Sequence, residues 1–170
     1  MTLARFYLHG GQVIMPTVAQ TEAGFYTDVE PVSVVDIRDA QLVKESMQAM
    51  LARPNPQIPT PAAPAEPGSV VLDALGLKKW IAFEKHAVLY TVHRRQDDTV
   101  VYATGRGADG MWIRRKDRES HLASDRSAAD LADTIYSDML RQPEASPPAA
   151  PAPLMLLPPP KDKPPAEEER

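Results

Sequence analysis

The residues of this chain that are able to do chemistry are scattered, and their spacing matches no catalytic signature. Residues 105–110 (GRGADG) have the G-x-G-x-x-G spacing of a dinucleotide-binding loop. In that motif the last glycine opens a helix whose N-terminus faces the pyrophosphate. Here a strand-like run, residues 111–115, follows instead. We therefore interpret the glycines as a loop between two strands.

The other reactive side chains do not form a recognisable site either. The four histidines lack metal-ligand spacing, and the absence of cysteine excludes thiolate zinc sites, iron–sulfur clusters and cysteine nucleophiles. Ser120, His121 and Asp125 are the residue types of a hydrolase triad, but neighbours in sequence rarely supply its geometry. We expect a protein that is not an enzyme and has no metal and no cofactor.

Charge is segregated along the chain. The net charge is −4, yet residues 78–118 hold ten Lys and Arg against five acidic residues. A basic patch near Tyr102 and Trp112 is able to contact nucleic acid or an acidic protein, although a solvated sheet face is an equally good interpretation. The candidate residues of this patch are Arg94, Arg95, Arg114, Arg115 and Lys116.

The first half of the chain offers a different candidate surface. Its acidic residues gather around a predicted strand and the start of a predicted helix, where they would attract a basic protein partner by complementary charge. An aromatic residue beside them, Tyr26 or Phe25, is a candidate anchor. The partner-binding candidates are Tyr26, Asp28, Glu30, Asp36 and Asp39.

Strands and helices must position these side chains, and the sequence patterns predict most of them. Residues 13–37 predict a hairpin with a turn at residues 22–24, and Pro31 favours an edge strand or a bulge. Residues 70–72 predict a short strand, and residues 77–86 an amphipathic turn or helix. Three further strands, at residues 88–95, 99–104 and 111–115, predict a β-meander.

Two helices have clear start signals. Asp36 or Asp39 caps a helix whose apolar stripe includes Val43, Met47 and Leu51 and which ends near Arg53. The closing helix begins with a capping box of Ser127 and Asp130, and its stripe runs from Ala128 to Met139. Strands in one antiparallel sheet with amphipathic helices on one face correspond to the α+β class, which is the fold we expect.

Proline sets the domain organisation. Of 18 prolines, 16 lie in residues 54–67 and 143–165. We interpret residues 54–68 as a proline-rich crossover inside a single domain of residues 1–142, and residues 143–170 as a disordered tail. The one late apolar run, residues 154–157, is too short to span a bilayer, so we expect a cytoplasmic protein without membrane contact.

Two segments resemble a known family. Residues 16–32 (PTVAQTEAGFYTDVEPV) and 70–80 (VVLDALGLKKW) are similar to the small α+β immunity proteins of bacterial contact-dependent growth inhibition, and the resemblance covers about residues 15–120. It implies a non-catalytic inhibitor that binds one toxin domain tightly, with residues 1–14 and the tail as additions to the common core. The sequence leaves two main hypotheses: a protein-binding module of this kind, and a small nucleic-acid-binding regulator that uses basic strands 94–118. A small enzyme is the third.

Overall fold

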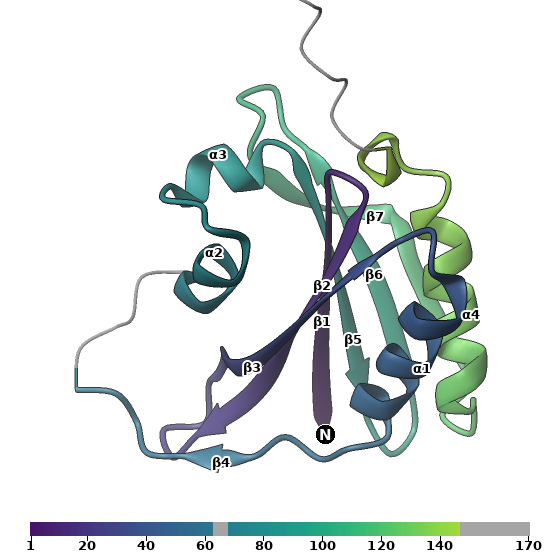
Figure 1. Ribbon diagram of the computed structural model, residues 1–170. Coiled ribbons are helices and arrows are strands. Elements are labelled where there is room, and N and C mark those ends of the chain that lie inside the picture. Colours follow the sequence, from purple (N-terminus) through teal and green to yellow (C-terminus); the bar gives the residue numbers. More distant parts are fainter. Residues whose placement is uncertain (63–67, 147–170) are drawn as a thin grey trace, which may run out of the picture.

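The protein is built on one antiparallel sheet whose middle is formed by the first strand of the chain. The computed structural model describes residues 1–62 and 68–146 (Figure 1). The strand order is β3-β2-β1-β5-β6-β7, and a short strand, β4, pairs in parallel with β2. The strands are β1 (Thr2–His9), β2 (Gln12–Thr21), β3 (Tyr26–Asp36), β4 (Gln57–Ile58), β5 (Ala87–Arg94), β6 (Thr99–Arg106) and β7 (Trp112–Leu122).

Helices cover both faces of this sheet, although we predicted them on one face. Two twelve-residue helices, α1 (Ala40–Leu51) and α4 (Ala128–Met139), pack on what we call the first face. Two short helices, α2 (Ser69–Leu75) and α3 (Trp80–Glu84), lie over the second face (Figure 1). A 3-10 turn, η1 (Pro143–Ala145), follows α4, and the rest of the predicted tail lies outside the described residues.

The prediction of a strand at residues 70–72 is wrong, because this apolar run belongs to α2. Short apolar runs do not distinguish a buried strand from a buried helix. Here the C-terminal end of the segment identifies it as a helix. Gly76 adopts φ 64°, its N–H donates to Asp73 O, and Leu77 N–H donates to Leu72 O. This left-handed cap closes a helix after two turns and is suited to glycine.

The resemblance also suggested that residues 1–14 are an addition, whereas β1 is the central strand. It pairs with β5 from Thr2↔Arg94 to His9↔Ala87. Ala4 and Phe6 face the first-face core, while Arg5 and Tyr7 face the second. Both faces of β1 are covered, and its pairing with β5 joins segments far apart in the sequence, which no local pattern indicates.

Several local predictions are confirmed. The hairpin of β2 and β3 places Pro31 on an edge strand, and β5, β6 and β7 form the predicted meander. Asp39 caps α1, with Leu42 N–H donating to its side chain, and Ser127 caps α4. The described part of the predicted crossover includes β4, so this part is joined to the sheet.

The first two strands separate beyond their connecting turn. Their pairing covers only residues from Tyr7↔Ile14 to His9↔Gln12. Farther along, the Asn55 side chain joins them: its amide accepts from Leu3 N–H at 2.8 Å and donates to Leu3 O and Val18 O, each at 2.8 Å. The distal part of the β2–β3 hairpin thus diverges from the sheet, and a cleft opens on the second face.

Candidate functional site

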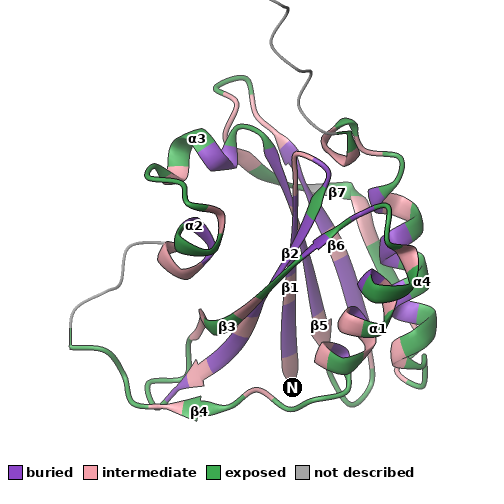
Figure 2. Ribbon diagram, viewed as in Figure 1, coloured by how far each residue is buried: buried purple, intermediate pink, exposed green. Residues whose placement is uncertain are grey.

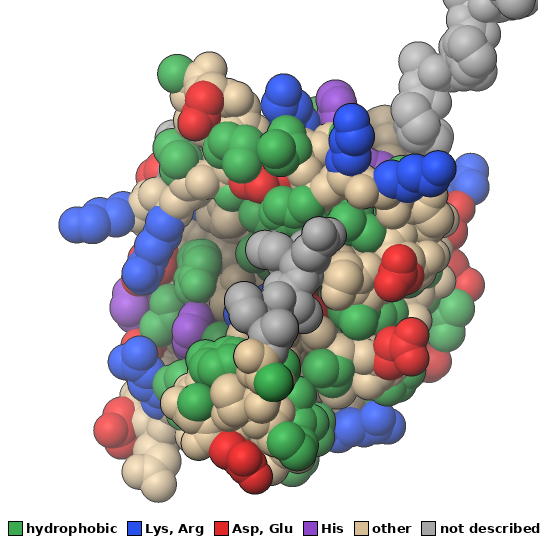
Figure 3. Space-filling view, turned by 90° about the vertical axis from the view of Figure 1, so that its left-hand side faces the viewer, with side chains coloured by type: hydrophobic (Ala, Val, Ile, Leu, Met, Phe, Trp, Pro, Cys, Tyr) green, Lys and Arg blue, Asp and Glu red, His purple; other side chains and the backbone are tan. Residues whose placement is uncertain are grey.

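The largest described depression is this cleft, with a volume of about 530 Å³. Its floor is the second face of the sheet, and its walls come from the distal hairpin on one side and from α2 and α3 on the other. Seen from this side, the molecule is hollowed between hydrophobic side chains, with Lys and Arg along one edge (Figure 3). Six of the ten Phe, Trp and Tyr residues of the chain line it: Tyr7, Phe25, Tyr26, Trp80, Tyr102 and Trp112.

A partly buried ion pair lies at the floor of the cleft. Arg5 Nη1 donates to Asp28 Oδ1 at 2.8 Å, and Tyr7 Oη donates to Asp28 Oδ2 at 2.5 Å. The Asp28 side chain is 6% exposed. Burial and the neighbouring Asp28 carboxylate raise the pKa of Tyr7 well above its ordinary value, so its hydroxyl stays a donor. Because β2 lies between β1 and β3, this network fastens the hairpin across the sheet.

The aromatic side chains form one continuous cluster. The Trp80 and Trp112 rings meet edge to face at 5.5 Å, and Tyr7 contacts both rings at about 6 Å. Phe83 packs behind them. Trp112 Nε1 donates to Ala87 O at 2.8 Å, which fixes the indole. Edge-to-face contacts of this kind hold rings in defined orientations, so this wall is preformed.

The open end of the cleft carries a stack of three side chains from adjacent strands. The rings of His93 and Tyr102 are stacked at 5.6 Å, and the Arg114 guanidinium lies 5.1 Å from the Tyr102 centroid. Burial, and then the charges of Arg95, Arg114 and Arg5, lower the pKa of His93. His93 is therefore neutral at pH 7 and packs as an aromatic ring.

Beyond this stack, a chain of ion pairs runs along β7. Arg114 Nη2 lies 2.8 Å from Glu119 Oε2, and the two nitrogens of the His121 ring each lie 3.0 Å from a carboxylate, of Asp98 and of Glu119. These two hydrogen bonds raise the pKa of His121, and the bond from Arg114 lowers that of Glu119. The charges of this edge are thus largely compensated within the chain.

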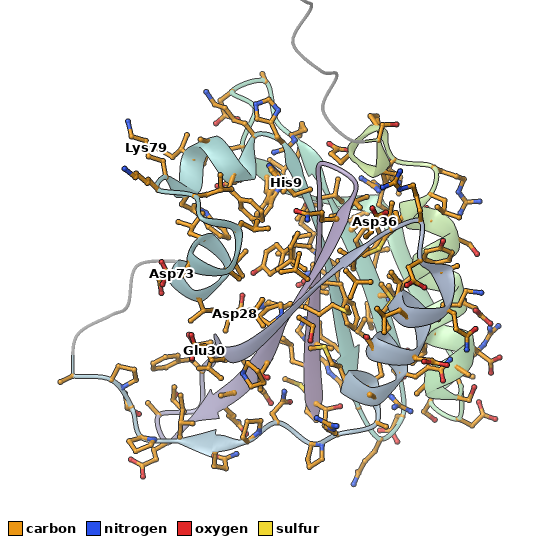
Figure 4. All side chains as sticks on the ribbon, viewed as in Figure 1. His9, Asp28, Glu30, Asp36, Asp73 and Lys79 are labelled. Atoms are coloured by element: carbon orange, nitrogen blue, oxygen red, sulfur yellow. The ribbon has the colours of Figure 1, made fainter. Side chains whose placement is uncertain are left out.

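The structure brings together two of the five acidic-surface candidates. Tyr26 and Asp28 line the cleft, whereas Glu30 lies exposed farther along β3 (Figure 4). Asp36 is paired with Arg38 at the other end of the strand, about 26 Å from Asp28 at 3.3 Å per residue. Asp39 caps α1. Strand length therefore separates candidates that are close in sequence.

The basic candidates are also divided. Arg114 and Lys116 border a shallow depression on the second face, and Arg95 is exposed after β5. Arg94 donates to Leu51 O at the end of α1, away from that surface. Arg115 lies in β7, and its side chain is outside the described part of the structure.

The remaining candidate motifs have structural roles. Residues 105–110 comprise the end of β6 and the turn to β7, where Gly107 N–H donates to Met111 O, as we expected for an inter-strand loop. Ser120 and His121 are adjacent in β7 and border different depressions. In the described ranges no three His, Cys, Asp or Glu residues are placed to share a metal ion.

The sequence did not point to Tyr7 or Trp80 as parts of a site, and it placed Trp112 only beside the candidate basic patch. They come from three distant segments, and only the topology of the sheet brings them into contact. A signal was present in β1, where Leu3, Arg5, Tyr7 and His9 alternate with apolar residues. No helix in residues 1–62 or 68–146 is long and apolar enough to cross a membrane.

Backbone comparison, but not sequence comparison, finds similar proteins. No family model and no curated protein match this chain. A "Protein of Unknown Function NMB0488 from Neisseria meningitidis" is similar with a TM-score of 0.52 and 12% identity, over 78% of this chain and 89% of that one.

A chain described as "CdiA-CT/CdiI toxin and immunity complex from Yersinia pseudotuberculosis" is similar with a TM-score of 0.48 and 10% identity, over 81% of this chain and 95% of that one. Similarity at these identities concerns the fold and not the activity. The comparison thus establishes that this chain has a fold like that of the Neisseria protein.

Proposed function

We propose that this chain is a non-enzymatic protein-binding module and that its partner is a toxin domain, which it neutralises as an immunity protein. The composition of the cleft is the observation that carries the proposal. Tyr, Trp, Phe and Arg are the residue types enriched at protein interfaces, and Tyr, Trp and Arg dominate their binding energy. Six aromatic residues and Arg5 meet in this one cleft.

The preformed state of the cleft supports the same proposal. Arg5 and Tyr7 both donate to Asp28, and the Trp80 and Trp112 rings pack edge to face. A surface that is already ordered loses little conformational entropy when a partner binds. This favours the tight binding that an inhibitor needs.

The segments that carry the family resemblance form opposite walls of the cleft. Residues 16–32 include Phe25, Tyr26 and Asp28 on the hairpin side, and residues 70–80 run from α2 to Trp80 on the other side. A shared recognition surface would preserve these two segments together. The toxin class of the partner is taken from that resemblance.

An immunity protein of this class would be encoded beside its toxin, so the test is to look for a toxin gene next to this one and to co-express its toxin domain with this chain. Replacing Phe25 and Tyr26 with Ala removes two exposed or half-exposed aromatic side chains of the cleft. We expect each substitution to cost about 2 kcal/mol of binding free energy, which is about a thirtyfold loss of affinity. With both substitutions, rescue of growth should fail. Leu42→Ala, an equally exposed apolar site on α1, is the control.

Two results would overturn the proposal. One is a wild-type chain that neither rescues growth nor binds the toxin domain in calorimetry. The other is equal affinity of the cleft variants and the Leu42→Ala control, which would place the interface outside the cleft.

One observation favours a second candidate, nucleic-acid binding. Arg114 lies over Tyr102 beside the exposed Lys116, and stacked aromatic and cationic groups bind unpaired bases. The salt dependence of RNA binding tests it: loss of one phosphate contact in Lys116→Ala would reduce the slope of log K against log salt by about 0.7. Because Glu119 already neutralises Arg114, we rank this candidate second.

A further inference from the structure

Several polar groups of the cleft are already bonded within the fold. Asp28 accepts from Arg5 and Tyr7, Thr104 Oγ1 accepts from Leu89 N–H, and Trp112 Nε1 donates to Ala87 O. A charged or polar group that enters would lose water without gaining a free partner at these positions. The cleft therefore favours an apolar occupant with side chains that pack on aromatic rings.

The chain itself contains a segment with this chemistry. Residues 154–157 (LMLL) are the only run of four large apolar side chains in the proline-rich tail, and prolines flank the run on both sides. Leu and Met pack well on aromatic faces, and the thioether of Met makes favourable contacts with rings. Flanking prolines restrict the free segment, which lowers the entropy lost on docking.

The described fold ends at the edge of the sheet where α3 ends. Gly11 N–H donates to Glu144 O at 2.8 Å, and Arg106 lies 3.8 Å from the Glu144 carboxylate. Arg106 in turn donates to Glu84 O in α3, and the Glu84 side chain accepts from Trp112 N–H at 2.8 Å. Two residues after Glu144, the described chain ends at Ser146, so it ends beside the elements that carry the aromatic wall.

The intervening length is sufficient. Eight residue steps separate Ser146 from Leu154, and at about 3.1 Å per residue in an extended proline-rich segment they span about 25 Å. This is close to the length of an eight-residue strand such as β1, at 3.3 Å per residue. The apolar run can reach the cleft of its own chain.

We propose that residues 154–157 occupy the cleft in the free protein, packed on Trp80 and Trp112, and that the partner displaces them. The displacement rests on the proposed function, whereas the docking does not. The tail would act as a built-in competitor, which shields the aromatic surface until a partner with higher affinity arrives.

Both tryptophans of the chain line the cleft, so tryptophan fluorescence reports on its occupancy. The test variant replaces Leu154, Met155, Leu156 and Leu157 with Ser in the full chain, without the partner. We expect emission at longer wavelength and stronger quenching by iodide. The control variant, Ala149→Ser with Ala150→Ser and Ala152→Ser, should match the wild type. Identical emission and quenching in all three chains would overturn the proposal.

A second measurement locates the run directly. The chain has no cysteine, so Ala152→Cys gives a single site for a spin label. We expect it to broaden the indole N–H signals of Trp80 and Trp112 more strongly than a label at Glu167→Cys. Equal effects of the two labels would contradict docking.

Mixing spin-labelled chains with isotope-labelled chains distinguishes docking within one chain from docking between chains. Broadening that appears only between chains would assign the occupant to a second copy and overturn the proposal. All of these measurements use the free protein, so their failure would leave the partner-binding proposal standing. A failed growth rescue would equally leave the docked tail in place.

Discussion

The two faces of the sheet carry different tasks, and the length of the covering helices accounts for the difference. On the first face, α1 and α4 extend over twelve residues each and bury Phe6, Met47 and Met139 completely. On the second face, α2 and α3 have seven and five residues and leave Trp80 and Trp112 half-buried. Both short helices carry exposed and half-buried positions (Figure 2). One face supplies stability, and the other holds the cleft in which we propose that a partner binds.

We expect the largest loss of stability from a substitution in the first-face core. Met47→Ala removes a completely buried side chain, so we expect the free energy of unfolding to fall by about 2 to 5 kcal/mol in urea denaturation. Met50→Ala makes the same change at a half-buried position of the same helix and should cost less. Equal, small losses would mean that α1 adds little to the core.

The second face combines a buried apolar cluster with a polar network around Asp28. Asp28→Asn removes the charge that Arg5 and Tyr7 share, and we expect a loss of about 1 to 3 kcal/mol in the same measurement. Tyr7→Phe removes only one hydrogen bond and should cost about 1 kcal/mol. If Asp28→Asn left stability unchanged, the network would not hold the hairpin in position.

The Asn55 side chain, which links β1 and β2, should contribute less to the free energy of unfolding. Asn55→Ala removes its bonds to Leu3 and Val18, and we expect a loss of about 1 to 2 kcal/mol with faster hydrogen exchange at Leu3 N–H. Gln57→Ala, which removes an exposed bond to Gln20, is the control. Unchanged exchange at Leu3 would show that the strands stay in place without Asn55.

The smallest expected changes in stability come from the titration of two histidines on the second face. The two histidines change the stability in opposite directions as the pH changes. The lowered pKa of His93 means that protonation favours the unfolded chain, so this site destabilises the fold as pH falls below 6.5. The raised pKa of His121 gives stability that is complete below 6.5 and is lost as pH rises through the folded value.

Titration of the two ring signals by NMR measures these shifts. We expect His93 to titrate below 6.5 and His121 above it. Asp98→Asn should lower the midpoint of His121, because it removes one of the two carboxylates that hold the imidazolium, and should leave His93 unchanged. Equal midpoints for both rings in the wild type would contradict the contrast between a buried stack and a solvated ion-pair chain.

The sequence predicted elements that depend on neighbouring residues, and it missed features that depend on pairing between distant segments. The meander, the β2–β3 hairpin and the caps of α1 and α4 depend on neighbouring residues, and each is present. The central position of β1 depends on pairing with β5, far along the chain, and on burial of both its faces. The helix α2 depends on its glycine cap more than on its apolar pattern.

The residues of the candidate site also fall into those that the sequence predicted and those that only the fold brings together. Asp28 was predicted from its acidic neighbours and Tyr26 as an aromatic anchor beside them, but Asp28 pairs within the fold rather than forming an acidic surface. Trp80 and Trp112 meet only when α3 packs against the start of β7. Side-chain type alone does not reveal such a meeting, since single aromatic residues are more often part of a core.

The position of β1 also governs the order in which the fold is able to form during synthesis. The strand leaves the ribosome early, but its partner β5 ends at Arg94. Until then, the edge of β1 that β5 will cover offers unpaired backbone groups, with apolar Phe6 and Leu8 beside them. Pairing over such a separation is slow, so a nascent chain that stalls before β5 is the form of this protein most exposed to aggregation.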